Sequence, residues 1–109
     1  MVWSLAVALL LGQQLPAAQA STSEYEPIIR AYHQDRLPNP DATRYHGFRY
    51  VGVRPSYRRR VETDMICVSY TMRARFVGDV DILSAIWIRD GRVLETIEGV
   101  PATTVCATV

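Results

Sequence analysis

Residues 60–76, RVETDMICVSYTMRARF, contain the clearest alternation of apolar and polar side chains in the chain. The apolar phase consists of Ile66, Val68, Tyr70, Met72, Ala74 and Phe76, and the other phase consists of Cys67, Ser69, Thr71, Arg73 and Arg75. A period of two is typical of a β-strand, because successive side chains point to opposite faces of a sheet. The segment therefore predicts a strand with one face in the core and the other in water.

The segments around this strand also have strand patterns. Residues 82–89 are apolar on both phases, which predicts a strand in the middle of a sheet. The Asp90-Gly91 dipeptide that follows favours a type I′ hairpin turn, with residues 93–97 as the partner strand. Residues 45–53 predict a first strand, in which Phe48, Tyr50 and Val53 share a face, and Gly78-Asp79 predicts a turn.

A helix is predicted at residues 24–36, where apolar positions recur at helical spacing. Ser23 and Glu26 form a capping-box pattern, and Pro27 falls where the first turn is expected. Pro38 and Pro40 end the segment. We therefore expect an α+β fold, in which one N-terminal helix packs on a small antiparallel β-meander sheet.

The two best-patterned strands predict the core. Their apolar phases contain the side chains that we expect to be buried, which are Ile66, Val68, Tyr70, Met72, Ile86 and Ile88.

The N-terminus, residues 1–20, is typical of a signal peptide. An apolar run of about ten residues, too short to cross a bilayer, is followed by the small-residue ending Ala18-Gln19-Ala20. Removal after Ala20 would leave residues 21–109 as a single small domain, with a periplasmic or secreted location and no membrane span. The alternative interpretation is a buried N-terminal helix of a cytosolic protein.

Cys67 and Cys106 are the two cysteines of the chain. An even count in an exported protein predicts a disulfide, which would hold residues 102–109 over the sheet face that the helix leaves open. A redox-active pair is the alternative, although such pairs usually have the Cys-x-x-Cys spacing, which these two lack.

The charged residues are nearly balanced. Twelve arginines and no lysine face eleven acidic residues, so the net charge is +1, which argues against a nucleic-acid-binding protein. Arg58, Arg59 and Arg60 form the one concentrated run, which Arg54, Arg73 and Arg75 could extend into a basic patch. Such a patch could contact an anionic envelope component or an acidic protein. Alternatively, the run is a solvated edge that discourages sheet-to-sheet association.

The sequence contains no recognised catalytic, cofactor-binding or metal-binding motif. His33 and His46 have no ligand spacing and are expected on the surface, and Asp79 and Asp81 are too few for a calcium loop. No Gly-x-Ser-x-Gly elbow or phosphate-binding glycine loop is present. These observations predict a non-enzymatic protein without a cofactor.

Several short motifs resemble those of a group of small uncharacterised proteobacterial exported proteins. The motifs are Ile29-Arg30-Ala31-Tyr32, Leu37, Asp41-Ala42, the Ile66-Cys67-Val68 strand and the Asp90-Gly91 hairpin. That group has an Ile-x-x-Tyr-Leu helix, a Leu-x-Asp-Pro-x-Ser-Ala turn and a Val-Cys-Gly strand. The resemblance implies an exported α+β domain and no particular activity.

Together these features predict an exported binding or envelope-associated module. An inhibitor of a secreted hydrolase is one alternative, and it would need a rigid exposed loop, for which residues 54–60 and 99–104 are candidates. An enzyme with an unrecognised site is the other alternative, and it would need a pocket with convergent polar groups.

Overall fold

A computed structural model describes residues 17–107 of the chain. In chain order the elements are α2 (Ala17–Arg36), η1 (Pro40–Ala42), β1 (Arg44–Pro55), β2 (Glu62–Ala74), β3 (Gly78–Arg89), β4 (Arg92–Glu98) and α3 (Val100–Ala107). The four strands form one antiparallel sheet in the order β1-β2-β3-β4. The predicted α+β fold, an N-terminal helix with a meander sheet, is confirmed.

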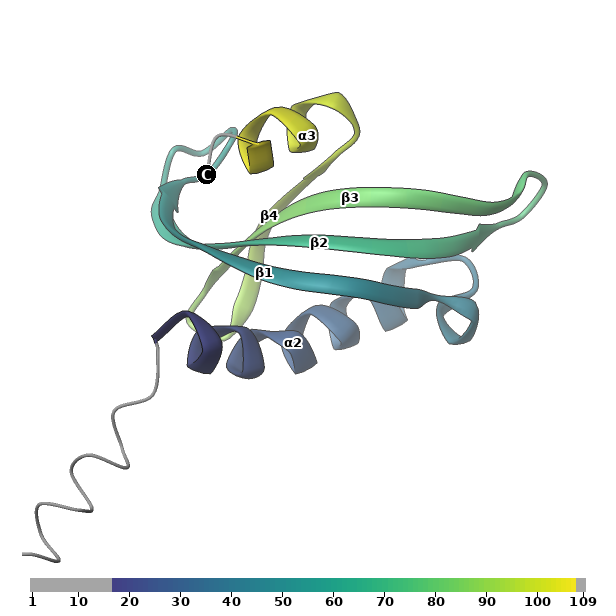
Figure 1. The fold of residues 1–109 in the computed structure, drawn as a ribbon, viewed down its shortest axis with the longest axis horizontal. Coiled ribbons are helices and arrows are strands. Elements are labelled where there is room, and N and C mark those ends of the chain that lie inside the picture. The colour runs from purple at the N-terminus through teal and green to yellow at the C-terminus, as the bar shows by residue number, and fades with distance from the viewer. Residues whose placement is uncertain (1–16, 108–109) are drawn as a thin grey trace, which may run out of the picture.

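Helices α2 and α3 cover opposite faces of this sheet (Figure 1). On the α2 face, Ile29 of the helix is fully buried against Ile66 and Ile86, which are partners across β2 and β3. Five of the six predicted core residues are buried there. Met72 is the exception, because it lies near the far end of β2 and is only half-buried at the rim of the cluster.

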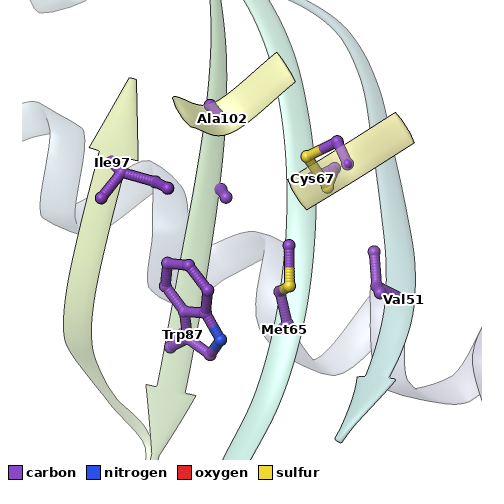
Figure 2. Close-up of a cluster of buried hydrophobic side chains, with 8 residues drawn as sticks. Val51, Met65, Cys67, Trp87, Ile97 and Ala102 are labelled. Carbon is purple, nitrogen blue, oxygen red and sulfur yellow. A yellow bond between two sulfur atoms is a disulfide. The ribbon is translucent and has the colours of Figure 1, made fainter. Parts of the chain in front are cut away.

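The α3 face carries a second hydrophobic core (Figure 2). It consists of Val51, Met65, Cys67, Ala85, Trp87, Ile97, Ala102 and Cys106. The expectation that this face is open to water is therefore wrong for the middle of the sheet. Helix α3 excludes solvent here, and only 4% of the Cys67 surface is exposed.

A disulfide joins Cys67 on β2 to Cys106 on α3. The predicted pairing, and the predicted position of the C-terminal segment over this face, are confirmed. The segment is a helix, however, where the sequence predicted a tail or a short strand. Pro101 lies in the first turn of α3, where its missing N–H has no intrahelical acceptor to lose, and Gly99 turns the chain with a φ of 76°.

The two hairpin turns differ in how well they were predicted. Asp90 and Gly91 both have positive φ, 53° and 74°, as a type I′ turn requires. The other turn is formed by residues 75–77, because Gly78 and Asp79 already pair with β2. Phe76, predicted on the core face, is therefore 95% exposed at the tip of this hairpin.

Strand β1 contains irregularities that change its side-chain phase. Its pairing with β2 shifts register between Tyr45 and Gly47 and again between Tyr50 and Gly52. A β-bulge of this kind reverses the face on which the following side chains lie. The bulge after Tyr50 brings Val53 opposite Asp64, on the α2 face that Phe48 and Tyr50 share, so their predicted common face is confirmed. Val53 lies near the end of β1 and is 56% exposed, while Val51 is buried in the α3-side core.

Helix α2 begins at Ala17, seven residues before the predicted start. The residues 17–20 include three alanines, the strongest helix former, and Pro27 lies inside the helix. Ser23 and Glu26 therefore do not mark its N-terminus. Residues 1–16 of the predicted signal peptide lie outside the described residues. Within residues 17–107, no helix has the combination of length and apolar character that a bilayer span needs.

The disulfide is expected to contribute strongly to stability. The bond closes a sequence separation of 39 residues, for which chain entropy predicts about 4 kcal/mol. The intact mass of the non-reduced protein should be two hydrogens below that of the reduced protein. The double variant Cys67→Ala/Cys106→Ala should unfold at a lower urea concentration. Two alkylatable thiols in the purified, non-reduced protein would contradict this prediction.

Substitution of Ile86 tests the central packing. Ile86→Ala removes a fully buried side chain of β3 from the core under α2, so the free energy of unfolding should fall by about 2–5 kcal/mol. Val53→Ala, at an exposed strand position, is the matched control and should change stability by less than about 0.5 kcal/mol. Urea unfolding followed by circular dichroism measures both. Equal effects of the two substitutions would show that the packing is wrong.

Candidate functional site

The run Arg58-Arg59-Arg60 lies in the short connection between β1 and β2. The backbone N–H groups of Arg58 and Arg59 donate hydrogen bonds to the carboxylate of Glu95 on β4, at 2.7 and 3.2 Å. Only 8% of the Glu95 surface is exposed. Because hydrogen bonds to a buried carboxylate are strong, Glu95 holds the connection against the edge of the sheet.

The two ends of the connection are also bonded to each other. The side-chain oxygen of Ser56, which is fully buried, accepts a hydrogen bond from the N–H of Val61 at 3.1 Å. The backbone N–H of Ser56 donates to the carbonyl of Val61, and that of Arg60 donates to the carbonyl of Ser56. The loop is therefore fixed from both sides, while the side chains of Arg58, Arg59 and Arg60 remain exposed.

The fold brings two further arginines to this loop. Arg59, Arg89 and Arg92 line a common hollow of about 570 Å³, which we call the arginine hollow. Its remaining lining residues are Asp90, Val93 and Leu94. The three arginines come from the β1–β2 connection and from both sides of the β3–β4 turn. In a meander these two connections lie at the same end of the sheet, which explains the convergence (Figure 1).

The arginine hollow has an excess of positive charge. Asp90 is its one acidic lining residue, and it lies 3.9 Å from the guanidinium of Arg89 at an exposed position. Neither Arg59 nor Arg92 makes an ion pair with any residue in the described range 17–107. Guanidinium groups without a carboxylate partner can bind phosphate or carboxylate groups of another molecule.

The sequence predicted only part of this cluster. It identified the run at 58–60 but joined it to Arg73 and Arg75, which the structure places at the opposite end of the sheet. Arg73 and Arg44 both pair there with Asp79, each at 3.4 Å. The sequence analysis missed Arg89 and Arg92. They flank the Asp90-Gly91 turn, and in a meander this turn lies at the same end of the sheet as the run at 58–60, so the predicted strand order could have indicated them.

His33 is buried, so the expectation that it lies on the surface is wrong. It is 5% exposed, and its Nδ1 lies 2.7 Å from the hydroxyl of Tyr45. The ring also packs against the ring of Tyr70. Burial lowers the pKa of His33 below its ordinary value, and the negative charge of Glu98 opposes this shift. His33 therefore belongs to the core under α2.

Other tyrosines under α2 are paired with acidic residues. The hydroxyls of Tyr25 and Tyr50 both donate to the carboxylate of Asp64, and that of Tyr70 donates to Glu98 at 2.9 Å. Burial raises the pKa of Tyr25 and Tyr70, and for Tyr50 the main cause is the hydrogen bond to Asp64. These tyrosines therefore remain protonated donors, of which Tyr25 joins α2 to the sheet while Tyr50 and Tyr70 join strands to one another.

His46 belongs to a separate polar chain on the α3 side of the sheet. The hydroxyl of Thr71 lies 2.6 Å from Nε2 of His46 and 2.6 Å from the carboxylate of Asp81. An ionised Asp81 can only accept, so Thr71 donates to Asp81 and accepts from the Nε2–H of His46. These hydrogen bonds orient the imidazole, and they direct the hydroxyl proton of Thr71 to Asp81. His46 is a donor to Thr71 in this arrangement, so it does not act as a base that activates the hydroxyl.

A hollow of about 380 Å³ lies beside the C-terminal end of α3. Its walls include Phe48, Leu83 and the disulfide, and Arg49 is its one charged residue. The guanidinium of Arg49 donates to the carbonyl of Cys106 at 2.7 Å, which caps the end of the helix. Arg49 therefore has a structural role here, and the arginine hollow remains the better candidate for binding.

The described residues contain no metal-ligand cluster, and one of the two candidate inhibitor loops is mostly helical. Among residues 17–107, no group of three or more His, Cys, Asp or Glu side chains converges on a common point. Residues 100–104, part of the second candidate inhibitor loop, belong to α3 and do not form an exposed loop.

Comparison of the chain with protein families, curated proteins and solved structures gives no match.

The burial of His33 predicts that stability depends on pH. The pKa of His33 is lower in the folded protein than in the unfolded chain. As the pH falls through about 6.5, His33 of the unfolded chain therefore binds a proton before His33 of the folded protein does. Proton binding stabilises the unfolded chain, so the free energy of unfolding should decrease there. Urea unfolding between about pH 8 and pH 5 measures this dependence. His33→Phe, which keeps a ring in the core, should flatten it. His46→Gln is the control, and a dependence lost in that variant instead would contradict the assignment.

Proposed function

We propose that the protein is an exported, non-enzymatic module that binds an anionic component of the cell envelope through the arginine hollow. The convergence of Arg59, Arg89 and Arg92 on one hollow is the observation that carries this proposal. Arg58 and Arg60 extend the positive surface along the same loop. Phosphate groups match such a site, because a guanidinium donates two parallel hydrogen bonds to phosphate oxygens.

Preorganisation of the loop supports this proposal. The hydrogen bonds from the loop backbone to Glu95 and Ser56 fix the chain at the base of Arg58, Arg59 and Arg60 before any ligand binds. Only the side chains then need to become ordered on binding, which lowers the entropic cost. The Glu95 carboxylate accepts from backbone N–H groups and forms no ion pair with an arginine of residues 17–107.

The exported location is part of the same proposal. The disulfide and the signal-peptide pattern of residues 1–20 both favour an oxidising compartment. Removal after Ala20 stays a prediction, which the N-terminal sequence of the exported protein would test. The resemblance to proteobacterial exported proteins also stays a prediction, and it supports the same location.

A second candidate is an inhibitor of a secreted hydrolase. The fixed connection between β1 and β2 favours it, since protease inhibitors present rigid loops. In that case the loop alone, residues 56–61, would carry the interaction, and Arg89 and Arg92 on the neighbouring hairpin would contribute little. The contribution of the hairpin arginines therefore distinguishes the two candidates.

The proposed site predicts salt-sensitive binding to anionic vesicles. The triple variant R59S/R89S/R92S should bind phosphatidylglycerol-containing vesicles about a hundredfold more weakly, since each basic residue near such a surface contributes about 1 kcal/mol. Binding of the wild-type protein should also weaken between 0.1 and 1 M salt, where the Debye length falls from about 10 to about 3 Å. Vesicle co-sedimentation measures both effects.

The matched control is R44S/R73S/R75S, which removes the same charge from the opposite end of the sheet. This variant should keep most of the wild-type affinity. Equal losses in the two triple variants would show that net charge alone drives binding, and unchanged affinity in R59S/R89S/R92S would refute the site. Circular dichroism confirms the fold of each variant.

A further inference from the structure

A groove lies between helix α2 and the β3–β4 hairpin, and we call it the helix groove. It measures about 540 Å³ and is lined by Pro27, Ile28, Ala31, Tyr32, Asp35, Arg36, Gly91, Arg92 and Val93. The helical residues recur every three or four positions, so they form one stripe along α2. From Pro27 to Asp35 this stripe spans about 12 Å, at 1.5 Å for each residue.

The lining of the helix groove is mainly apolar in its middle. Ile28, Tyr32 and Val93 are half-buried and form its walls, and Ala31 is exposed between them. Space is open beside Gly91, where an added methyl group would meet no atom within 4 Å. The charged residues Asp35 and Arg36 lie at the far end of the helical stripe.

The helix groove lies next to the arginine hollow. Arg92 and Val93 line both of them, so the two share one wall at the β3–β4 turn. The guanidinium of Arg92 belongs to this shared wall, and it has no ion-pair partner within residues 17–107. A positively charged hollow and a largely apolar groove thus lie next to each other around Arg92.

We infer that these two neighbouring hollows together bind an anionic amphiphile, with its phosphate group in the arginine hollow and its alkyl chain in the helix groove. The inference rests on the proposed function, since it uses the same arginines for the phosphate group. Charge complementarity determines the orientation of the ligand, because the guanidinium groups of Arg59 and Arg92, which have no ion-pair partner in residues 17–107, line the arginine hollow, while Ile28, Tyr32 and Val93 line the middle of the groove. The length of the helical stripe is comparable with an extended octyl chain.

The test uses four probes below their micellar concentrations. Octyl phosphate carries both parts of the ligand, butyl phosphate shortens the chain, inorganic phosphate carries the anion alone, and octyl glucoside carries the chain alone. Isothermal titration calorimetry of the exported protein measures each affinity. Octyl phosphate should bind about fifteenfold more tightly than butyl phosphate, since each half-buried methylene is worth about twofold.

Variants on α2 locate the alkyl chain. Ala31→Phe fills the middle of the groove, and Ala31→Asp places a charge there, so both should reduce the difference between octyl and butyl phosphate to less than threefold. Gln34→Phe adds the same aromatic ring at an exposed position on another side of α2 and should preserve the difference. Circular dichroism and thermal unfolding confirm that each variant is folded.

The outcomes separate the inference from the proposed function. If octyl and butyl phosphate bind equally, and R59S/R89S/R92S abolishes that binding, the groove is refuted and the anion site stands. If octyl glucoside binds as tightly as octyl phosphate, the anion site is refuted together with the amphiphile. A difference between octyl and butyl phosphate that persists in Ala31→Phe would place the chain elsewhere and overturn the inference.

Discussion

The pairing of β2 with β3 is the interaction on which the rest of the structure depends. These two strands occupy the middle of the sheet, and their side chains are buried on both faces, as in the pairs Ile66–Ile86 and Met65–Trp87. A strand that is apolar on both faces needs two covering layers. Helix α2 supplies one layer and α3 the other, and a helix of eight residues such as α3 is too short to be stable without such packing. The disulfide holds α3 against Cys67, in the centre of the sheet.

The candidate site follows from the topology of the same sheet. In a four-stranded meander the first and third connections lie at one end, so residues about thirty positions apart in sequence become neighbours. The loop that carries Arg59 is bonded to Glu95 of β4, and the turn before β4 carries Arg89 and Arg92. The edge strand β4 thus connects loop, turn and α2. The opposite end of the sheet has arginines too, but two of them share the carboxylate of Asp79.

Local sequence patterns predicted the helix, the strands and one turn better than they predicted the tertiary contacts of single residues. The phases of Ile66 and Ile86 and the turn at Asp90-Gly91 depend on neighbours in the chain, so the sequence alone could indicate them. The burial of His33 depends on Tyr45, across the interface between helix and sheet, and no local pattern reports that contact. The two β-bulges of β1 are irregularities that simple alternation cannot show. The arginine hollow required the order of the strands in addition to their positions.

The near-neutral net charge of +1 does not describe the surface that a partner would meet. Several acidic side chains accept hydrogen bonds within the domain. Asp64 accepts from two tyrosines, Glu98 accepts from Tyr70, and Glu95 accepts from backbone N–H groups. These carboxylates keep their charge, but none of the three forms an ion pair with an arginine of residues 17–107. Positive charge therefore accumulates where arginines have no acidic partner. The distribution of hydrogen-bond partners, more than the balance of charged residues, gives this small domain an electrostatically distinct end.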